Sequence, residues 1–292
     1  MLRVVLPKGS LEEQTLRLFA SADLAVRRSS ARAYHGTIAD DGIERVSLLR
    51  PQEIPLYVEE GFFDLGVTGR DWVEETTADV EIVASLEYAK GGVGRGVRVV
   101  LAVAADDPAE SASSLAPGSR ISTEYPNLTA RFFERLGIPV RVFPSYGATE
   151  AKVPEIVDAI VDVAETGSTL RAHGMKVIET LLESEVVLIA SRAASKDAAT
   201  RRAIENVCTL LMGALMAEGR VLIKLNVDAE RLDDLLDVLP SMKSPTVSRH
   251  ADGRGHAVES VVEKACVNTL IPRLKEAGAT DVLELPISKI IP

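Results

Sequence analysis

Residues 158–170, DAIVDVAETGSTL, have the composition and order of a phosphate-binding loop. An apolar strand leads into a short polar loop and then into a helix, and Gly167 in the loop lets the backbone approach a ligand closely. The N-terminus of a helix adds free N–H groups and the positive end of the helix dipole. Thr166, Ser168 and Thr169 in the loop offer hydroxyls that can contact a phosphate. The segment lacks the Gly-Lys-Ser/Thr of a Walker loop, and an ordinary helix cap would also select Ser and Thr here.

Four charged residues near strand-to-helix junctions suit a polyphosphate ligand. Asp158 and Asp162 border the strand before the loop, and Mg²⁺ on a polyphosphate usually takes one or two carboxylates. Lys8 and Arg50 lie at two other junctions, where cations neutralise phosphate or a leaving pyrophosphate. A solvated surface charge explains each of the four taken alone. It is their combination that predicts a polyphosphate site.

The alternation of apolar runs and amphipathic stretches up to residue 218 predicts two α/β lobes with parallel strands. Ser10 and Glu13 form a capping box that should begin the first helix. Strands are expected at residues 3–6, 65–68, 82–85, 97–102, 119–123, 140–143, 159–163 and 186–191. Helices are expected at residues 11–20, 51–60 and 128–136, from Thr169 onward, and as one long helix at 196–218.

The remaining residues, from 220 onward, predict a separate domain with the ferredoxin-like order βαββαβ. Its strands are expected at residues 221–227, 246–249, 257–263 and 281–286, and its helices at 229–239 and 266–277. Small domains of this shape often bind amino acids as regulatory modules, although a fold alone does not establish a function.

Composition narrows the class of protein. The 292 residues are 46% hydrophobic and 26% charged, which predicts a folded chain of more than one domain. A net charge of -10, from 33 basic and 43 acidic residues, repels polyanions and argues against a nucleic-acid partner. The chain shows neither a signal peptide nor a membrane-spanning stretch, so the cytoplasm is the expected location. Cys208 and Cys266 lack disulfide or zinc spacing and are expected in the core.

Several segments together resemble the ATP phosphoribosyltransferase family, in the family's own order. They are LPKGSL, LRPQEIPLYVEEGFFDLGVTGRDWVEE, ISTEYPNLTARFFERLGI, GATEAKVPEIVDAIVDVAETGSTLRAHGMKVIE and the tail that contains SPT. The most specific is DAIVDVAETGSTL, which resembles the family's loop for phosphoribosyl pyrophosphate. The resemblance covers nearly the whole chain.

The resemblance implies a fold of two lobes like those of type II periplasmic solute-binding proteins, with the active site in the cleft between them. A C-terminal ferredoxin-like regulatory domain follows. The implied domains are residues 1–92 and 179–218 for lobe I, 93–178 for lobe II and 219–292 for the regulatory domain. Because such lobes exchange strands, lobe I should take back a segment near residues 181–193.

In that family, N1 of the ATP adenine attacks C1 of phosphoribosyl pyrophosphate in the presence of Mg²⁺. The products are N1-(5-phosphoribosyl)-ATP and pyrophosphate, in the first step of histidine biosynthesis. Such a glycosyltransferase needs positioning and charge neutralisation more than acid–base chemistry. The positions that carry over are Lys8 and Arg50 for catalysis and ATP, Tyr125 for ATP, Asp162 and Glu165 to Leu170 for phosphoribosyl pyrophosphate, and Asp158 and Asp162 for the metal.

The family is also inhibited by histidine and forms hexamers built from dimers, so the resemblance implies both properties here. Met242, Ser244 and Thr246 fall in the segment that resembles the family's histidine site. Asn226 aligns with a position that is acidic in some relatives, and its amide would accept from the ammonium of histidine without an ion pair.

The sequence departs from the family at Ser10, where many relatives have Arg, at Glu165, where Ser is common, and at residues 152–155, which replace a Gly/Ala-rich stretch. Two other functions are considered. A non-catalytic solute-binding protein would share the lobes. The lack of a recognisable export signal and the presence of the Thr-Gly-Ser-Thr loop count against that alternative. A regulatory paralogue of the kind that partners short transferases would resemble aminoacyl-tRNA synthetases, which this chain does not.

Overall fold

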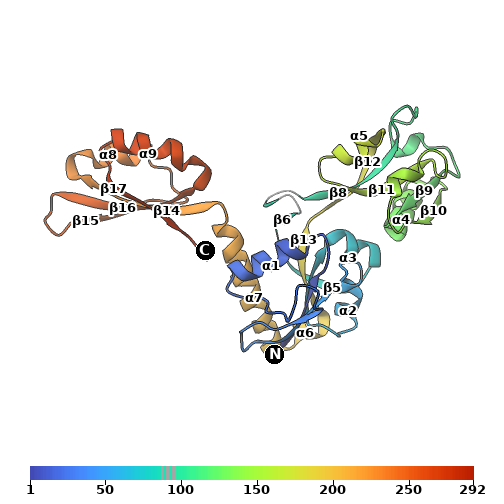
Figure 1. Cartoon of the computed structure of the whole chain (residues 1–292), viewed down its shortest axis with the longest axis horizontal. Coiled ribbons are helices and arrows are strands. Elements are labelled where there is room, and N and C mark those ends of the chain that lie inside the picture. The colour runs from blue at the N-terminus through green and yellow to red at the C-terminus, as the bar shows by residue number, and fades with distance from the viewer. Residues whose placement is uncertain (87, 90–91, 94–95) are drawn as a thin grey trace. The chain divides into compact units, whose positions relative to one another are not determined.

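The computed structural model describes residues 1–86, 88–89, 92–93 and 96–292, and its contacts divide the chain into two compact units. The first unit is Met1–Cys208 and the second is Thr209–Pro292. Figure 1 labels their helices and strands. The first unit contains two lobes, each built on its own sheet.

Lobe I is built on a six-stranded sheet with the order β2-β3-β1-β4-β13-β5. The strands are β1 (Leu2–Pro7), β2 (His35–Gly36), β3 (Ile43–Leu49), β4 (Leu65–Gly69), β5 (Val80–Leu86) and β13 (Val186–Ser191). Strands β1, β3 and β4 are parallel, whereas β13 runs antiparallel between β4 and β5. The helices are α1 (Glu12–Ser21), α2 (Ile54–Glu59), α3 (Arg70–Thr76) and α6 (Arg192–Lys196). The parallel strands therefore end at one edge, where their loops can build a site.

Lobe II is built on a five-stranded sheet with the order β10-β9-β11-β8-β12. The strands are β8 (Val97–Ala104), β9 (Arg120–Thr123), β10 (Arg141–Pro144), β11 (Ala159–Ala164) and β12 (Met175–Ser184). The helices are α4 (Pro126–Leu136) and α5 (Ser168–Ala172), with 3-10 turns at Ala112–Ser114 and Thr149–Lys152. Strands β9, β10 and β11 are parallel, and β8 is antiparallel to both of its neighbours. A short pair, β6 (Tyr88–Ala89) and β7 (Gly92–Val93), precedes this lobe.

The two lobes exchange strands as expected, because β13 returns to the sheet of lobe I after lobe II is complete. Strand β12 pairs with β8 along its whole length to Ser184, so the chain changes sheets at Glu185. This crossing lies later than residue 179, where lobe I was expected to resume. No strand was predicted between residues 163 and 186, and pairing with β8 forms β12 there.

The second unit is a four-stranded antiparallel sheet with the order β15-β16-β14-β17. Its strands are β14 (Arg220–Asp228), β15 (Thr246–Arg249), β16 (Gly255–Glu263) and β17 (Thr280–Pro286). Figure 1 shows α8 (Leu232–Val238) and α9 (Val267–Glu276) over one face of this sheet. Two 3-10 turns, Ala229–Arg231 and Lys264–Cys266, introduce these helices. This order confirms the ferredoxin-like βαββαβ fold, and with the paired lobes it confirms the predicted fold class.

Three local expectations are wrong. Ser10 does not cap α1, because the helix begins one residue later and the carboxylate of Glu12 accepts from the Gly9 N–H at 3.4 Å instead. The long helix from residue 196 is divided in two: the carboxylate of Asp197 accepts from the Thr200 N–H at 2.9 Å and so begins α7 (Ala198–Ala217). Cys266 is exposed at the start of α9, while Cys208 is half-buried.

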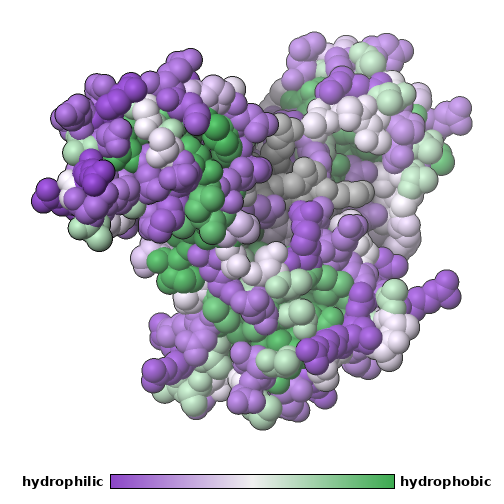
Figure 2. Space-filling model, turned by 60° about the vertical axis from the view of Figure 1, so that its left-hand side comes forward, coloured by the Kyte–Doolittle hydropathy of each residue, from purple (hydrophilic) through white to green (hydrophobic). Residues whose placement is uncertain are grey.

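Hydrophilic residues cover most of the surface seen in Figure 2, and apolar side chains appear there in separate patches. This distribution agrees with cores that are enclosed within each lobe and within the C-terminal sheet. Among the described residues, no helix combines the length and the apolar character that crossing a bilayer requires.

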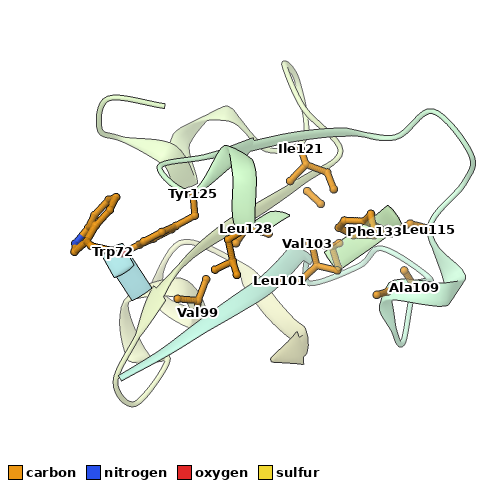
Figure 3. Close-up of a cluster of buried hydrophobic side chains, with 13 residues drawn as sticks. Trp72, Val99, Leu101, Val103, Ala109, Leu115, Ile121, Tyr125, Leu128 and Phe133 are labelled. Atoms are coloured by element: carbon orange, nitrogen blue, oxygen red, sulfur yellow. The ribbon is translucent and has the colours of Figure 1, made fainter. Parts of the chain in front are cut away.

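Helix α3 of lobe I holds the start of α4 of lobe II. Glu75 is buried, and its carboxylate accepts from the backbone N–H groups of Asn127 at 3.0 Å and Leu128 at 2.8 Å. Those N–H groups belong to the first turn of α4 and have no partner within the helix. Trp72 stacks on Tyr125 with ring centroids 4.5 Å apart, and Figure 3 shows this pair beside the lobe II core. A carboxylate and an aromatic ring from lobe I therefore complete lobe II.

We expect Glu75→Ala to lower the free energy of unfolding by about 1–2 kcal/mol, as the loss of a helix cap does. Glu74→Ala is the matched control, because Glu74 is the exposed neighbour on the same helix and should change stability by less than about 0.5 kcal/mol. Urea unfolding followed by circular dichroism measures both. Equal losses in the two variants would show that the contact between α3 and α4 contributes no stability.

Candidate active site between the two lobes

The first unit has a cavity of about 820 Å³ that is lined by residues of both lobes. Lobe I contributes the loops after β1, β3 and β4, which are Ser10, Leu11, Pro51, Gln52, Gly69, Asp71 and Trp72. Lobe II contributes Glu124, Tyr125 and the run from Asp162 to Leu170. The strands that cross between the lobes contribute Gly96, Val97, Ser184, Glu185 and Val186, and Tyr88 completes the described lining. The volume suits a drug-sized or nucleotide-sized ligand.

The predicted phosphate loop lies on this cavity. Gly167 is the N-cap of α5 and has a φ of 69°, a left-handed conformation that L-residues rarely adopt. Thr166 folds over the helix start, where its hydroxyl donates to Ser168 Oγ at 2.9 Å and accepts from the Ser168 N–H at 3.4 Å. The next N–H groups of the first turn have no intrahelical acceptor. The arrangement can bind an oxyanion through backbone N–H groups and hydroxyls.

Asp162 is a half-buried carboxylate within β11, and no cation pairs with it among the described residues. Burial raises its pKa to about 6. That pKa already includes a lowering by the Val163 N–H, which donates to Asp162 Oδ1 at 2.7 Å, and a smaller rise caused by the nearby carboxylates of Glu124 and Glu150. Its negative charge is therefore poorly compensated in this state. A cation or a set of hydroxyl donors in the cavity would stabilise it.

Asp158 does not share a metal site with Asp162, which corrects the predicted pair. The guanidinium of Arg120 donates to Asp158 Oδ1 at 2.7 Å and to Oδ2 at 3.2 Å, and this bond holds the pKa of Asp158 below its usual value. Four residues of extended chain separate the two aspartates by roughly 13 Å, too far for one ion to bridge. Asp158 joins β11 to β9, and the described residues contain no group of three or more His, Cys, Asp or Glu placed to hold a metal.

Lys8 and Arg50 come together at the ends of β1 and β3, but they lie beside the cavity. The described lining residues include their neighbours, Ser10 and Pro51, but neither cation. Lys8 Nζ is 3.8 Å from Glu12 and 4.9 Å from the ring centre of Tyr34, while Arg50 is exposed. Both side chains are long and flexible, so a phosphate at the mouth of the cavity is within their reach.

A hydrogen-bonded cluster in the cavity wall was missed from sequence. The carboxylate of Asp71 accepts from the Tyr125 hydroxyl at 2.7 Å and from the Ser184 hydroxyl at 2.6 Å. All three residues are buried, and burial followed by the charge of Asp71 raises the pKa of Tyr125 well above its usual value. Tyr125 therefore stays a neutral donor that is already engaged. Its hydroxyl is therefore not free to bind a ligand.

Two signals in the sequence could have indicated this part of the site. Gly69 ends the buried strand β4 and Asp71 lies just beyond it, and a Cβ at Gly69 would overlap the Asp71 carboxylate. Gln52 follows Arg50-Pro51, and its Oε1 is buried with no hydrogen-bond partner among the described residues. A buried acceptor without a partner on a cavity wall suits an N–H donor of a ligand.

The predicted histidine-site residues lie on the second unit. Asn226 is on β14 and Thr246 on β15, while Met242 and Ser244 are in the loop before β15. Met242, Ser244 and Thr246 are exposed, and Asn226 is half-buried. Asn226 and Thr246 lie on the face of the sheet opposite the buried residues that contact α8 and α9.

Comparison with known proteins identifies the family. The family model described as ATP phosphoribosyltransferase matches residues 50–213, and the model described as HisG, C-terminal domain, matches residues 217–289. The ATP phosphoribosyltransferase of Pelotomaculum thermopropionicum is 46% identical over 293 residues, covering 100% of this chain and 99% of the relative. That of Nitratidesulfovibrio vulgaris (strain DSM 19637 / Miyazaki F) is 48% identical over 292 residues, covering 100% and 98%.

Among solved structures, the chain is similar in fold to the ATP phosphoribosyl transferase (HisG:HisZ) complex from Thermotoga maritima. The TM-score is 0.61 at 22% identity, over 72% of this chain and 98% of that chain. The C-terminal part of the chain is matched separately, by the C-terminal domain model at residues 217–289. Matches to both family models and to relatives over the full length show that the chain belongs to the ATP phosphoribosyltransferase family, in its long form with a C-terminal domain.

Proposed function

We propose that the cavity between the lobes joins ATP to phosphoribosyl pyrophosphate, forming N1-(5-phosphoribosyl)-ATP and releasing pyrophosphate. The observation that carries the proposal is the loop from Asp162 to Leu170, which lies on the cavity with an anion-binding first turn beside an uncompensated carboxylate. The full-length relatives favour this enzyme over a solute-binding protein with the same lobes.

The phosphate loop would bind the 5-phosphate of phosphoribosyl pyrophosphate. Thr169 would supply an N–H group in the first turn of α5, and Thr166 and Ser168 would supply hydroxyls beside it. Asp162 lies on β11, the strand that leads into this loop, and its carboxylate would accept hydrogen bonds from the ribose hydroxyls. Glu165 is exposed beside the loop, where a carboxylate can bind a hydroxyl but would repel a phosphate. The loop and Asp162 together would fix the position of C1.

Mg²⁺ fits this site through Asp162, which lines the cavity with a half-buried charge that no cation among the described residues neutralises. Asp158 does not fit it, because its carboxylate is bound by Arg120. A bound magnesium ion would neutralise the pyrophosphate and so favour its departure. The described residues do not form an all-protein cage, in keeping with an ion held largely by substrate oxygens.

ATP would enter from the side of lobe I. Lys8 and Arg50 would bind its phosphates at the mouth of the cavity, where both cations are close to the lining residues Ser10 and Pro51. The ring of Tyr125, already stacked on Trp72, would form an apolar wall for the adenine. The buried Oε1 of Gln52 is available to accept from an adenine N–H. Positioning N1 against C1 would supply most of the rate.

The direct test is incubation of the purified chain with ATP, phosphoribosyl pyrophosphate and Mg²⁺. We expect an adduct with altered ultraviolet absorbance and one pyrophosphate released for each adduct, with neither formed when one substrate or the metal is omitted. Binding of both substrates without adduct or pyrophosphate would contradict the proposed reaction.

We propose in addition that residues 219–292 bind histidine and inhibit the reaction, and that the chain forms a homo-oligomer, dimer to hexamer. The support is the C-terminal domain match and the hydroxyls of Ser244 and Thr246 on an exposed face. A ligand bound outside the cavity inhibits only by binding one global state better than another. Size-exclusion chromatography with and without histidine therefore tests both points together.

Gly167→Val should abolish detectable binding of phosphoribosyl pyrophosphate while the fold survives. Valine at a φ of 69° costs about 1–2 kcal/mol and fills the space that a phosphate must approach. Gly174→Val is the matched control, because Gly174 also has a φ of 69° and has no heavy atom within 4 Å of an added Cβ. Calorimetry that finds normal binding in Gly167→Val, or equal loss in both variants, would show that the loop is not the phosphate site.

Lys8→Ala and Arg50→Ala should each lower kcat/KM by about tenfold or more, because a cation near a developing charge contributes a few kcal/mol to a transition state. Melting temperatures should change little, because Arg50 is exposed and the ion pair of Lys8 with Glu12 is long, at 3.8 Å between Nζ and Oε2. Arg45→Ala is the control, because Arg45 is an exposed cation on β3, the strand that directly precedes Arg50. Losses of stability that match the losses of activity would mark both residues as structural.

Asp162→Asn should stabilise the protein without ligands above pH 6 and abolish substrate binding. The pKa of Asp162 is about 6 in the folded state and about 3.9 in an unfolded chain, so ionisation costs roughly 2–3 kcal/mol of stability at pH 8. This cost is absent below pH 4, where the carboxyl is protonated in both states. The gain in melting temperature should therefore fade as pH falls from 7 to 4. A gain that is independent of pH would contradict the raised pKa.

A further inference from the structure

Glu12, in the first turn of α1, binds two basic side chains with one carboxylate. Its Oε1 accepts from Arg28 Nη1 at 2.8 Å, and its Oε2 lies 3.8 Å from Lys8 Nζ. The same Oε2 accepts from the Gly9 N–H at 3.4 Å. Among the described residues, no other carboxylate pairs with Lys8 or Arg28. Glu12 is therefore the counter-ion of both cations.

The contact with Arg28 distinguishes this arrangement from an ordinary ion pair between neighbours. Glu12 and Lys8 are four residues apart, so their contact follows from the local path of the chain. Arg28 is 16 residues from Glu12, in the loop after α1, and its Nη1 also donates to the Ala31 carbonyl at 3.2 Å. The side chains of Glu12, Arg28 and Lys8 are 19%, 14% and 23% exposed, so water screens their charges only partly.

The surroundings of Glu12 favour a negative charge. Burial raises the pKa of its carboxyl, but the hydrogen bonds from Arg28 and from the Gly9 N–H, together with the charge of Lys8, hold that pKa below its ordinary value. Glu12 is therefore ionised at neutral pH. The position that its carboxylate occupies is one in which this loop binds an anion.

The donors around this carboxylate are those that proteins use for phosphate, namely an ammonium, a guanidinium and a backbone N–H. The guanidinium of Arg50 lies against the same loop, because a Cβ built on Gly9 would be 3.1 Å from Arg50 Nη1. Ser10 and Leu11, the next two residues, line the cavity. Glu12 therefore engages donors that a phosphate at the mouth of the cavity would need.

We propose that Glu12 is an internal competitor of the polyphosphate ligand for Lys8 and Arg28. The proposal rests on the proposed function, which assigns the phosphates of ATP to Lys8 and Arg50. A phosphate and the Glu12 carboxylate are both anions that need the same donors, so each binds at the expense of the other. A Glu side chain is long and flexible, and it can move into solvent when a phosphate takes its place. The competition weakens the binding of every polyphosphate, including the released pyrophosphate, and so favours product release.

The test is calorimetry with inorganic pyrophosphate on the full chain at a fixed Mg²⁺ concentration. Glu12→Gln removes the charge and keeps an oxygen that can accept from Gly9. It should bind pyrophosphate about tenfold more tightly than the wild type, because Lys8 and Arg28 lose their internal counter-ion. Glu13→Gln is the matched control, since Glu13 is the exposed neighbour on the same turn, and it should change the affinity by less than about twofold.

The sign of the change separates competition from positioning. If Glu12 only held the two cations in place for a ligand, Glu12→Gln would weaken the binding of pyrophosphate. Glu12→Ala removes the side chain altogether and should tighten binding in the same way as Glu12→Gln. Unchanged or weaker binding of pyrophosphate in both variants would overturn the proposal.

Nucleotide ligands separate this proposal from the proposed function on which it rests. ATP should bind Glu12→Gln more tightly than the wild type, whereas adenosine, which has no phosphate, should bind both equally. Tighter pyrophosphate with unchanged ATP would support the competition and overturn the assignment of Lys8 to the phosphates of ATP. A wild type that binds neither ATP nor pyrophosphate would overturn the proposed function itself.

Discussion

The cleft depends on two buried carboxylates of helix α3. A charge taken out of water must find donors, or the fold loses several kcal/mol. Asp71 finds the hydroxyls of Tyr125 and Ser184, and Glu75 finds the first N–H groups of α4. Most of these donors belong to lobe II, so satisfying the charges of lobe I brings lobe II into place. The walls of the cavity are positioned by this requirement before any ligand is bound.

Asp162 lies across the same cavity in the opposite condition. Its carboxylate has one N–H donor from its own neighbour and two other carboxylates nearby. Structural carboxylates such as Asp64 and Asp158 are instead bound by arginines on adjacent strands. Carboxylates with hydrogen-bonding partners on other strands or helices hold the structure of the lobes together. Asp162 lacks a partner of this kind among the described residues, which suits a residue that binds a substrate. Local instability of this kind is common at functional sites.

Sequence predicted those features that depend on neighbouring residues. The strands at 186–191 and 246–249 were predicted with the bounds observed, and the loop around Gly167 was placed on the cavity, because periodicity and turn residues are local signals. Features set by distant contacts were missed. Asp158 is bound by an arginine 38 positions away, and Glu75 caps a helix that begins beyond residue 125. No spacing in the sequence indicates partners that only the folded sheets bring together.

The insertion of β13 between β4 and β5 has a consequence for synthesis of the chain on the ribosome. Lobe II is contiguous, from Val97 to Ser184, whereas the sheet of lobe I lacks its inner strand until Ser191 has emerged. The lobe that begins first is therefore finished last, against the usual N-terminal order of folding. Until then β4 and β5 expose the edges that β13 will cover, and such open strand edges can pair with other chains.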